Sequence, residues 1–274
     1  MNTATPRQGP ISPGNVVSAA LRIYRDQFKV YFGLAAKAFL WILVPIYGWA
    51  KYGMYTGLMA RMAYQTLINE PESVRQAYKQ TSPKLWSYLL IGLLLALIFI
   101  AAYIAIGVGA AIIGSITGFV LGSVLSAVFG EAGIIISSIV VGLLIFAAVV
   151  IGLLQIASRL FIAEVPISIE PELRSATESI GRSWKLTESS IGRIQLVVLA
   201  TYLVTLPVIL VTNILPQLIL LRMDPTSPAF AFLNLVLIVV SIAASIAVLP
   251  FWQAAKGVLY YDLRSRREGA DLKI

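Results

Sequence analysis

The feature that most constrains this chain is the length of its uncharged segments. Residues 85–130 form a run of 46 residues without a formal charge, and runs of 27, 28 and 31 residues follow at 132–158, 194–221 and 225–255. A helix needs about 20 apolar residues to cross a bilayer core of roughly 30 Å. Charged residues make up only 12% of the chain. The sequence therefore predicts an all-α, polytopic membrane protein.

A further apolar region, residues 30–69, is interrupted by Lys37, Lys51 and Arg61. As a single crossing it would place basic clusters on both sides of the membrane, although Lys and Arg favour the cytoplasmic side. We therefore predict a hairpin here. Both termini are then cytoplasmic, and of 21 Lys and Arg residues only Lys51 and Arg222 lie outside. The six predicted transmembrane helices lie near 30–48, 53–69, 85–110, 132–157, 193–220 and 229–254.

The remaining boundaries are less sharply marked. We expect a disordered tail over 1–13, a single membrane domain over 14–262 and a basic cytoplasmic tail over 263–274. Residues 111–131 could extend the third span, lie in the outer interface or re-enter the membrane. We expect an interfacial or re-entrant helix, because a seventh crossing would leave the basic loop 159–193 outside. The four-residue spacing of Gly114, Gly118 and Gly122 permits close helix packing in lipid, which is the role we expect for them.

Three similar segments, 21–34, 73–92 and 179–198, each place an aromatic residue between two basic ones. Each precedes a predicted hairpin, so the fold is predicted as three hairpins, each preceded by a cytoplasmic amphipathic helix. Asn15 and Ser73 are suitable N-caps for the first two of these helices. The basic side chains could bind anionic headgroups or a soluble partner, or could simply fix the orientation of the hairpins. The candidate lipid- or partner-binding residues are Arg22, Tyr24, Arg25, Arg75, Tyr78, Lys79, Arg182, Trp184 and Lys185.

Arg61 is the one charge near the middle of a predicted span, and a charge at that depth is a functional candidate. Alternatively it extends to the headgroups along its apolar stem, as long basic side chains do. Asn213, Gln217 and Asn234 are the other intramembrane polar candidates. Proline in the same helices could kink them, as at some transport sites.

The composition removes several kinds of chemistry. The chain has no cysteine and no histidine, so it lacks thiolate nucleophiles, cysteine metal ligands and the usual acid–base group at neutral pH. It contains neither a phosphate-binding glycine loop nor paired intramembrane carboxylates. We therefore expect no enzymatic activity, no cofactor and no metal. The net charge of +8 comes from basic residues beside apolar runs, which indicates a membrane surface rather than nucleic acid.

Two stretches, RSWKLTESSIGRI (182–194) and YYDLRSRREGADL (260–272), resemble a prokaryotic family described as the membrane domain of glycerophosphoryl diester phosphodiesterases. The opening NVVSAALRIYRDQFKVYFGL (15–34) resembles the start of that family, so the resemblance covers essentially the whole chain. It implies a six-helix integral membrane protein of poorly defined function. The family's catalytic domain uses histidines, which this chain lacks, so no catalytic residue is transferred. The resemblance singles out Arg182 and Trp184, already named, and Tyr260, Tyr261, Asp262, Arg264, Arg267 and Glu268.

Several of these C-terminal residues have the spacing of helical ion pairs. Asp262, Arg264 and the run 266–268 could pair from i to i+4 on a helix that continues the last span. Such a network could be structural or could form a docking surface.

The function predicted from these observations is that of a non-enzymatic integral membrane protein. It would organise the membrane, bind anionic lipid or dock a partner through its basic cytoplasmic face. Its expected partners are membrane lipids and a protein or a second copy of the chain, without nucleic acid. The expected location is a bacterial inner membrane, with an internal photosynthetic membrane as a further possibility. The alternative is a transporter or channel for a small solute, with a path lined by Arg61, Asn213, Gln217 and Asn234.

Overall fold

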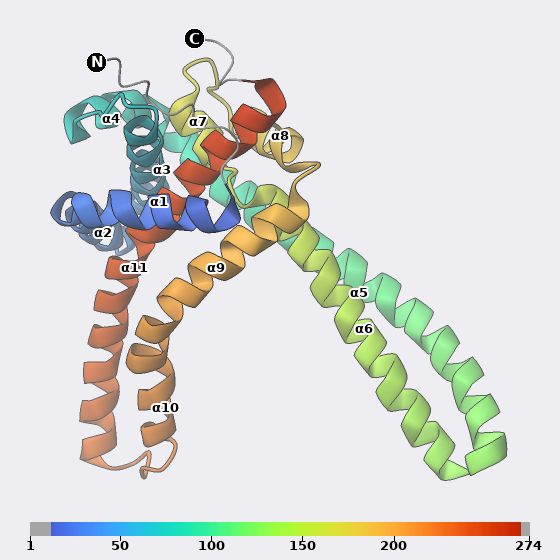
Figure 1. Ribbon diagram of the computed structural model, residues 1–274. Coiled ribbons are helices and arrows are strands. Elements are labelled where there is room, and N and C mark those ends of the chain that lie inside the picture. Colours follow the sequence, from blue (N-terminus) through green and yellow to red (C-terminus); the bar gives the residue numbers. More distant parts are fainter. Residues whose placement is uncertain (1–11, 270–274) are drawn as a thin grey trace. The chain divides into compact units, whose positions relative to one another are not determined.

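The computed structural model describes residues 12–269, and every element in that range is a helix (Figure 1). The all-α prediction is therefore confirmed for the described residues. The chain divides into two compact units, residues 92–160 and the segments on either side of them. The elements are α1 (Pro13–Asp26), α2 (Phe28–Ile42), α3 (Tyr47–Leu67), α4 (Val74–Thr81), the 3-10 helix η1 (Ser82–Lys84), α5 (Leu85–Phe129), α6 (Glu131–Leu160), α7 (Val165–Ile169), α8 (Ala176–Thr187), α9 (Ile191–Ile209), the π-helix η2 (Leu210–Ile214), α10 (Leu215–Leu220) and α11 (Pro228–Glu268).

Four helical segments are long and apolar enough to cross a membrane. Their apolar parts are mostly exposed, and in α11 every buried residue lies between Pro250 and Ser265. The apolar stretch of α11 before Pro250 thus faces outward, which suits hydrocarbon and not water. Exposed apolar helices of this length are those of a membrane protein. The four segments are Val74–Phe129, Glu131–Ile169, Ile191–Leu220 and Pro228–Glu268.

The first predicted pair of spans corresponds to α2 and α3, and neither is among these four segments. α3 contacts α2, α4, α7 and α11, and most of its residues are buried. Near its start, Lys51 Nζ donates a hydrogen bond of 2.8 Å to the hydroxyl of Tyr78 in α4. The predicted topology separated these two residues by a bilayer core of roughly 30 Å. The placement of Lys51 on the far side of the membrane is therefore wrong.

Within the second unit, α5 continues without a break to Phe129. The separate interfacial or re-entrant helix expected over 111–131 is therefore wrong, and residues 111–129 continue the helix of the third predicted span. The glycines of this stretch face α6: a Cβ on Gly114 would lie 2.2 Å from Ile145 Cδ1, and one on Gly122 would lie 3.4 Å from Ser137 Oγ. Their predicted packing role is confirmed. Gly130, with φ +58°, reverses the chain between α5 and α6.

In the first unit, the C-terminal half of α11 packs lengthwise against α3. A Cβ on Gly257 would lie 2.3 Å from the carbonyl oxygen of Ala60, so only glycine permits this approach. Four residues further along α3, the ring of Tyr64 lies 5.8 Å from that of Tyr260. Both helices therefore advance in the same direction through their contact. α1 packs against α9 and α11, and the Tyr24 hydroxyl donates a hydrogen bond of 2.7 Å to the carbonyl of Ala247.

The helix ends show which capping predictions were right. Ser12, rather than Asn15, caps α1, and its hydroxyl accepts a hydrogen bond from the Asn15 N–H. Ser73 caps α4 as predicted, in a capping box that Gln76 completes. α11 continues beyond the predicted domain end at 262 as far as Glu268. The rest of the predicted C-terminal tail, 270–274, and residues 1–11 of the N-terminal tail lie outside the described residues.

Candidate functional site: the charged end of the first unit

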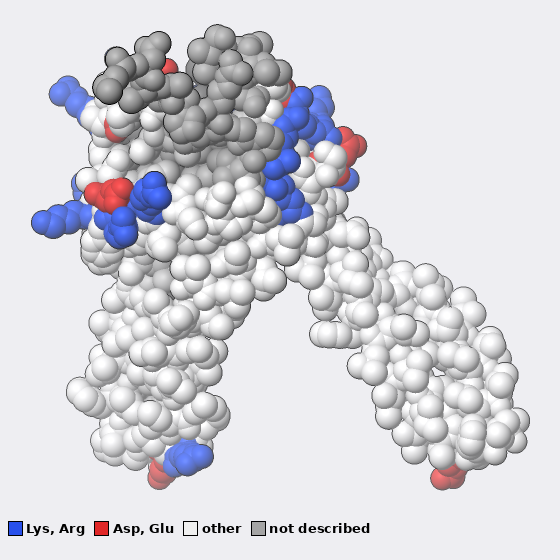
Figure 2. All heavy atoms as spheres, in the orientation of Figure 1, with Lys and Arg blue, Asp and Glu red and all other residues white. Residues whose placement is uncertain are grey.

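Charged side chains gather at one end of the first unit, over α1, α4, α8 and the last turns of α11 (Figure 2). Below them, residues 194–220 of α9, η2 and α10 and residues 228–255 of α11 carry no charge, as far as the loop that joins α10 to α11. This loop carries Arg222 and Asp224. The distribution matches the charge asymmetry in the sequence and marks this end as the candidate site.

The three repeated segments all contribute exposed basic residues to this end, but their aromatic residues differ in burial. In α1, Arg22 and Arg25 are exposed, whereas Tyr24 is buried and bonded to the carbonyl of Ala247. In α4, Arg75 and Lys79 are exposed, whereas Tyr78 is half-buried and accepts the hydrogen bond from Lys51. Trp184 and Lys185 of α8 are both exposed. The aromatic residue of the repeat is thus part of the packing in the first two segments and part of the surface only in the third.

Arg182, the remaining basic residue of the predicted surface, belongs to an internal network. Its Nε donates to Glu170 Oε1 at 3.0 Å, and its guanidinium also pairs with Glu268. The hydroxyl of Tyr260 donates to the same oxygen of Glu170. Arg264 Nε binds the other oxygen of Glu268 at 2.9 Å. The network joins the residues after α7 to α8 and α11, so Arg182 holds helices together instead of facing a ligand.

A second group of charges surrounds Asp262, whose side chain is fully buried. Arg193 Nε, at the start of α9, donates to Asp262 Oδ2 at 2.7 Å, and Arg266 Nε lies 3.2 Å from Oδ1. The predicted i to i+4 pairs are confirmed, both here and between Arg264 and Glu268. Arg267 reaches Glu188 at 3.1 Å. Of the other residues singled out by resemblance, Tyr261 is half-buried.

Arg61 is buried, and it does not extend to the headgroups as the snorkelling interpretation predicted. Its Nε donates to Glu72 Oε2 at 2.8 Å, and its Nη1 donates to the carbonyl of Ser168 at 2.8 Å. Lys84 Nζ donates to two further carbonyls, those of Ile167 and Glu170, both at 2.9 Å. The last carbonyls of α7 thus receive cationic donors, which compensate groups that lack helical partners.

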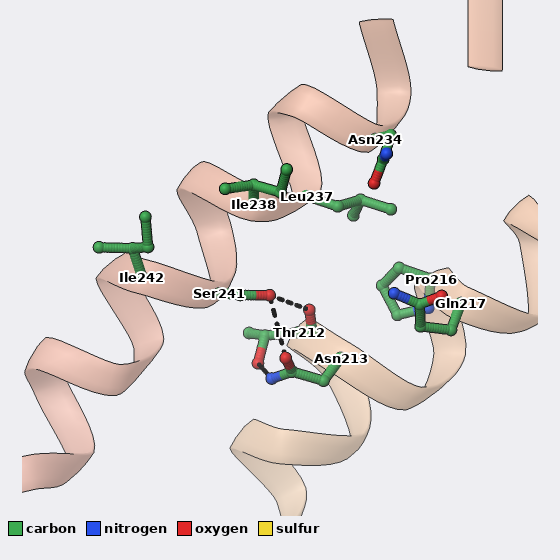
Figure 3. Close-up of a pocket in the computed structure, with 9 residues that line it drawn as sticks. All are labelled: Thr212, Asn213, Pro216, Gln217, Asn234, Leu237, Ile238, Ser241 and Ile242. Carbon is green, nitrogen blue, oxygen red and sulfur yellow. Dashed lines mark hydrogen bonds between the residues drawn. The ribbon is translucent and has the colours of Figure 1, made fainter. Parts of the chain in front are cut away.

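The other intramembrane candidates line a separate pocket of about 180 Å³ between α10 and α11 (Figure 3). Asn213, Gln217 and Asn234 lie around it, together with Thr212 and Ser241. Ser241 Oγ donates to Asn213 Oδ1 at 3.0 Å, and Asn213 Nδ2 donates to Thr212 Oγ1 at 2.8 Å. The structure therefore brings three of the four predicted path residues together.

This pocket lies where the α-helix α9 gives way to the π-helix η2. Pro207 cannot donate a backbone hydrogen bond, and the π-helix η2 begins three residues after it. π-Helical turns occur often at functional sites. Arg61 does not line the pocket, because it is held by Glu72 and α7. The polar path predicted from the sequence is therefore divided into two unconnected parts.

The start of α8 provides a pH-dependent test of this end of the molecule. Glu178 accepts hydrogen bonds of 3.2 Å from the backbone N–H groups of Arg174 and Ser175, and these hold its pKa below the usual 4.5. The stabilisation is therefore complete above the unfolded-state pKa and is lost as the pH falls through the lower folded-state value. We expect hydrogen exchange in the first turn of α8, corrected for intrinsic rates, to rise below pH 4.5. Glu178→Gln keeps the acceptor oxygen and should remove this dependence; an unchanged dependence would contradict the assignment.

No curated protein and no solved structure matches this chain. One family model does match it, over residues 24–263, and this range includes most of the helices of both units. The chain therefore belongs to the family described as a domain of unknown function, DUF7847.

Proposed function

We propose that this chain is a non-enzymatic integral membrane protein whose charged end binds anionic lipid headgroups. The observation that carries the proposal is the separation of its charges into an internal and an external set. Acidic residues such as Glu72, Glu170 and Asp262 are held inside by cationic partners. Among the described residues, 11 Lys and Arg but only 8 Asp and Glu are exposed, so the exposed side chains carry a net charge of +3.

The exposed Lys and Arg side chains lie near the ends of the apolar helices. Arg22, Arg25, Arg75, Lys79 and Lys185 are all exposed. A basic side chain close to an anionic membrane surface contributes about 1 kcal/mol of attraction. A set of such residues at the ends of apolar helices is therefore suited to collecting anionic lipid around the protein. A protein partner with an acidic surface, or a second copy of the chain, would be the other occupants of this face.

The membrane topology belongs to the same proposal. We place the crossings in the hairpin α5–α6 and in the hairpin formed by α9, α10 and α11, with the charged end in the cytoplasm of a bacterial cell. The proposal is supported by the preference of Lys and Arg for the cytoplasmic side. The contact of Lys51 with Tyr78 favours keeping α2 and α3 on the same side as α4. This arrangement has four crossings in place of the six expected from the sequence.

The test uses three exposed cations that make no internal ion pair described above. The protein is reconstituted in nanodiscs of mixed phosphatidylglycerol and phosphatidylcholine, and retained lipids are counted by native mass spectrometry. At about 1 kcal/mol per residue, Arg75→Gln, Lys79→Gln and Lys185→Gln together should lower the preference for the anionic lipid about a hundredfold. The charge-conserving control is Arg75→Lys, Lys79→Arg and Lys185→Arg. Equal retention by the neutral variant and the wild type would reject the proposal.

The pocket between α10 and α11 is the observation that favours the alternative, transport of a small solute. It contains amide and hydroxyl groups next to a π-helix, and polar groups within a membrane helix often mark a solute path. Flux of a small polar solute into proteoliposomes would support transport if Asn213→Leu abolished it. Absence of flux in the wild-type protein leaves headgroup binding as the better account of the charged end.

A further inference from the structure

The turn between α2 and α3 exposes an apolar surface at the edge of the first unit. No charged residue occurs from 38 to 50. The side chains of Leu40, Leu43, Ile46 and Trp49 are 67%, 79%, 59% and 50% exposed. Exposed apolar residues that follow one another along a chain indicate contact with a membrane or a partner. The contacts of α3 decide between these two.

The direction of α3 places this turn on the side of the membrane-crossing helices. α3 runs parallel to α11, with Ala60 beside Gly257. At a rise of 1.5 Å per residue, the start of α3 at Tyr47 lies about 20 Å back from Ala60, whereas Pro250 lies about 10 Å back from Gly257. The turn thus extends about 10 Å beyond Pro250, toward the exposed apolar half of α11. Interfacial segments are buried in a leaflet to a depth of about 5–10 Å.

The rim of the turn has the residues that favour a membrane–water boundary. The ring of Tyr47 lies 6.5 Å from that of Trp86, at the start of α5. Lys51 Nζ lies 5.5 Å from the centre of the Tyr47 ring and 6.0 Å from that of Trp41. Aromatic side chains and basic residues with long stems concentrate at headgroup level. Lys51 and its aromatic neighbours would therefore lie at the boundary, with Leu43 deeper.

The backbone of the turn is built for a close reversal. Ile46 has φ +62°, a conformation that is a genuine outlier for a β-branched residue. A Cβ on Gly48 would lie 1.8 Å from the carbonyl oxygen of Trp41, so the two helices meet closely only because residue 48 is glycine. Strain of this kind persists where the surrounding structure holds it, and it is concentrated at functional segments. Here it holds Leu43 and its neighbours at the tip.

From these observations we propose that the α2–α3 turn, residues 40–49, is a wedge inserted among the acyl chains of the cytoplasmic leaflet. It enters and leaves the bilayer on the same side. The inference rests on the proposed function in one respect, because the charged end must face the cytoplasm. The wedge would increase the area of that leaflet around the protein and hold the basic surface close to the headgroups.

The chain has no cysteine, so single cysteines report position without further changes. Leu43→Cys replaces the most exposed side chain of the tip. The full chain, in proteoliposomes of phosphatidylglycerol and phosphatidylcholine, is treated with a membrane-impermeant maleimide from either side. A second sample carries a bimane fluorophore at residue 43, and lipids with nitroxides at different depths quench it. Ser189→Cys, after α8, and Thr226→Cys, in the loop between α10 and α11, report the two aqueous sides.

We expect the maleimide to modify Leu43→Cys from neither side of the membrane. The emission of bimane at residue 43 should shift to the blue and should be strongly quenched by nitroxides within one leaflet. Modification from the side that reacts with Thr226→Cys would overturn the wedge and restore a crossing hairpin, while leaving headgroup binding intact. Rapid modification from the side of Ser189→Cys, without quenching, would also overturn it.

Discussion

Replacing Glu72 with alanine is expected to lower the free energy of unfolding by about 3–5 kcal/mol, because it removes one partner of a buried ion pair. The exposed fractions of the two side chains are 9% for Arg61 and 18% for Glu72. Without the carboxylate, the guanidinium would retain only the carbonyls of α7, Ser168 above all, and these carry no full negative charge. The effect would be measured by unfolding the purified protein in mixed micelles with increasing dodecyl sulfate.

A matched control is available on the surface of α1. Arg25 and Asp26 lie 3.5 Å apart, with side chains that are 77% and 57% exposed. Exposed pairs contribute about 0–1 kcal/mol, so Asp26→Ala should leave unfolding almost unchanged. The double variant Arg61→Met, Glu72→Met removes both charges and should be less destabilised than Glu72→Ala alone. Equal unfolding by Glu72→Ala and Asp26→Ala would show that the Arg61 pair is not buried in the folded protein.

The interior position of Arg61 illustrates what the sequence could not decide. Charge-free runs identify apolar helices because charges are costly in lipid, and this rule predicted the four long segments correctly. It cannot distinguish an apolar helix that faces lipid from one that is enclosed by other helices. α3 is of the second kind, since α2, α4, α7 and α11 cover it. Arg61 was assigned to the membrane because the basic residues on both sides of region 30–69 predicted a hairpin there, although its partner, Glu72, lies only eleven residues away.

The repeated segments show the same limit in the candidate site. Similar sequences predicted three equivalent surface helices, and local signals such as the Ser73 cap were read correctly. The environment of each aromatic residue is set by distant residues: Ala247 for Tyr24 and Lys51 for Tyr78. Local spacing likewise predicted the pair of Arg266 with Asp262, but gave no indication of Arg193.

The pair of Arg193 and Asp262 leads to the second large effect. Asp262→Ala should lower the free energy of unfolding by about 3–5 kcal/mol. The Asp262 side chain is fully buried, and that of Arg193 is 18% exposed. Among the described residues, Nη2 of Arg193 is buried without a hydrogen-bond partner. Asp262 is therefore the main partner that compensates the charge of Arg193 at the start of α9. Unfolding of the Asp262→Ala variant in mixed micelles would measure the lost stability.

The surface pair of Arg267 and Glu188 separates this effect from a general loss of charge at the end of α11. Glu188 is 61% exposed, so Glu188→Gln should cost less than about 1 kcal/mol. Arg193→Met, which removes the buried cation, should make Asp262→Ala less harmful, since the two residues share one interaction. If the changes in the free energy of unfolding caused by the two substitutions are additive, Arg193 and Asp262 do not stabilise each other. The contact between α9 and α11 would then depend on apolar packing alone.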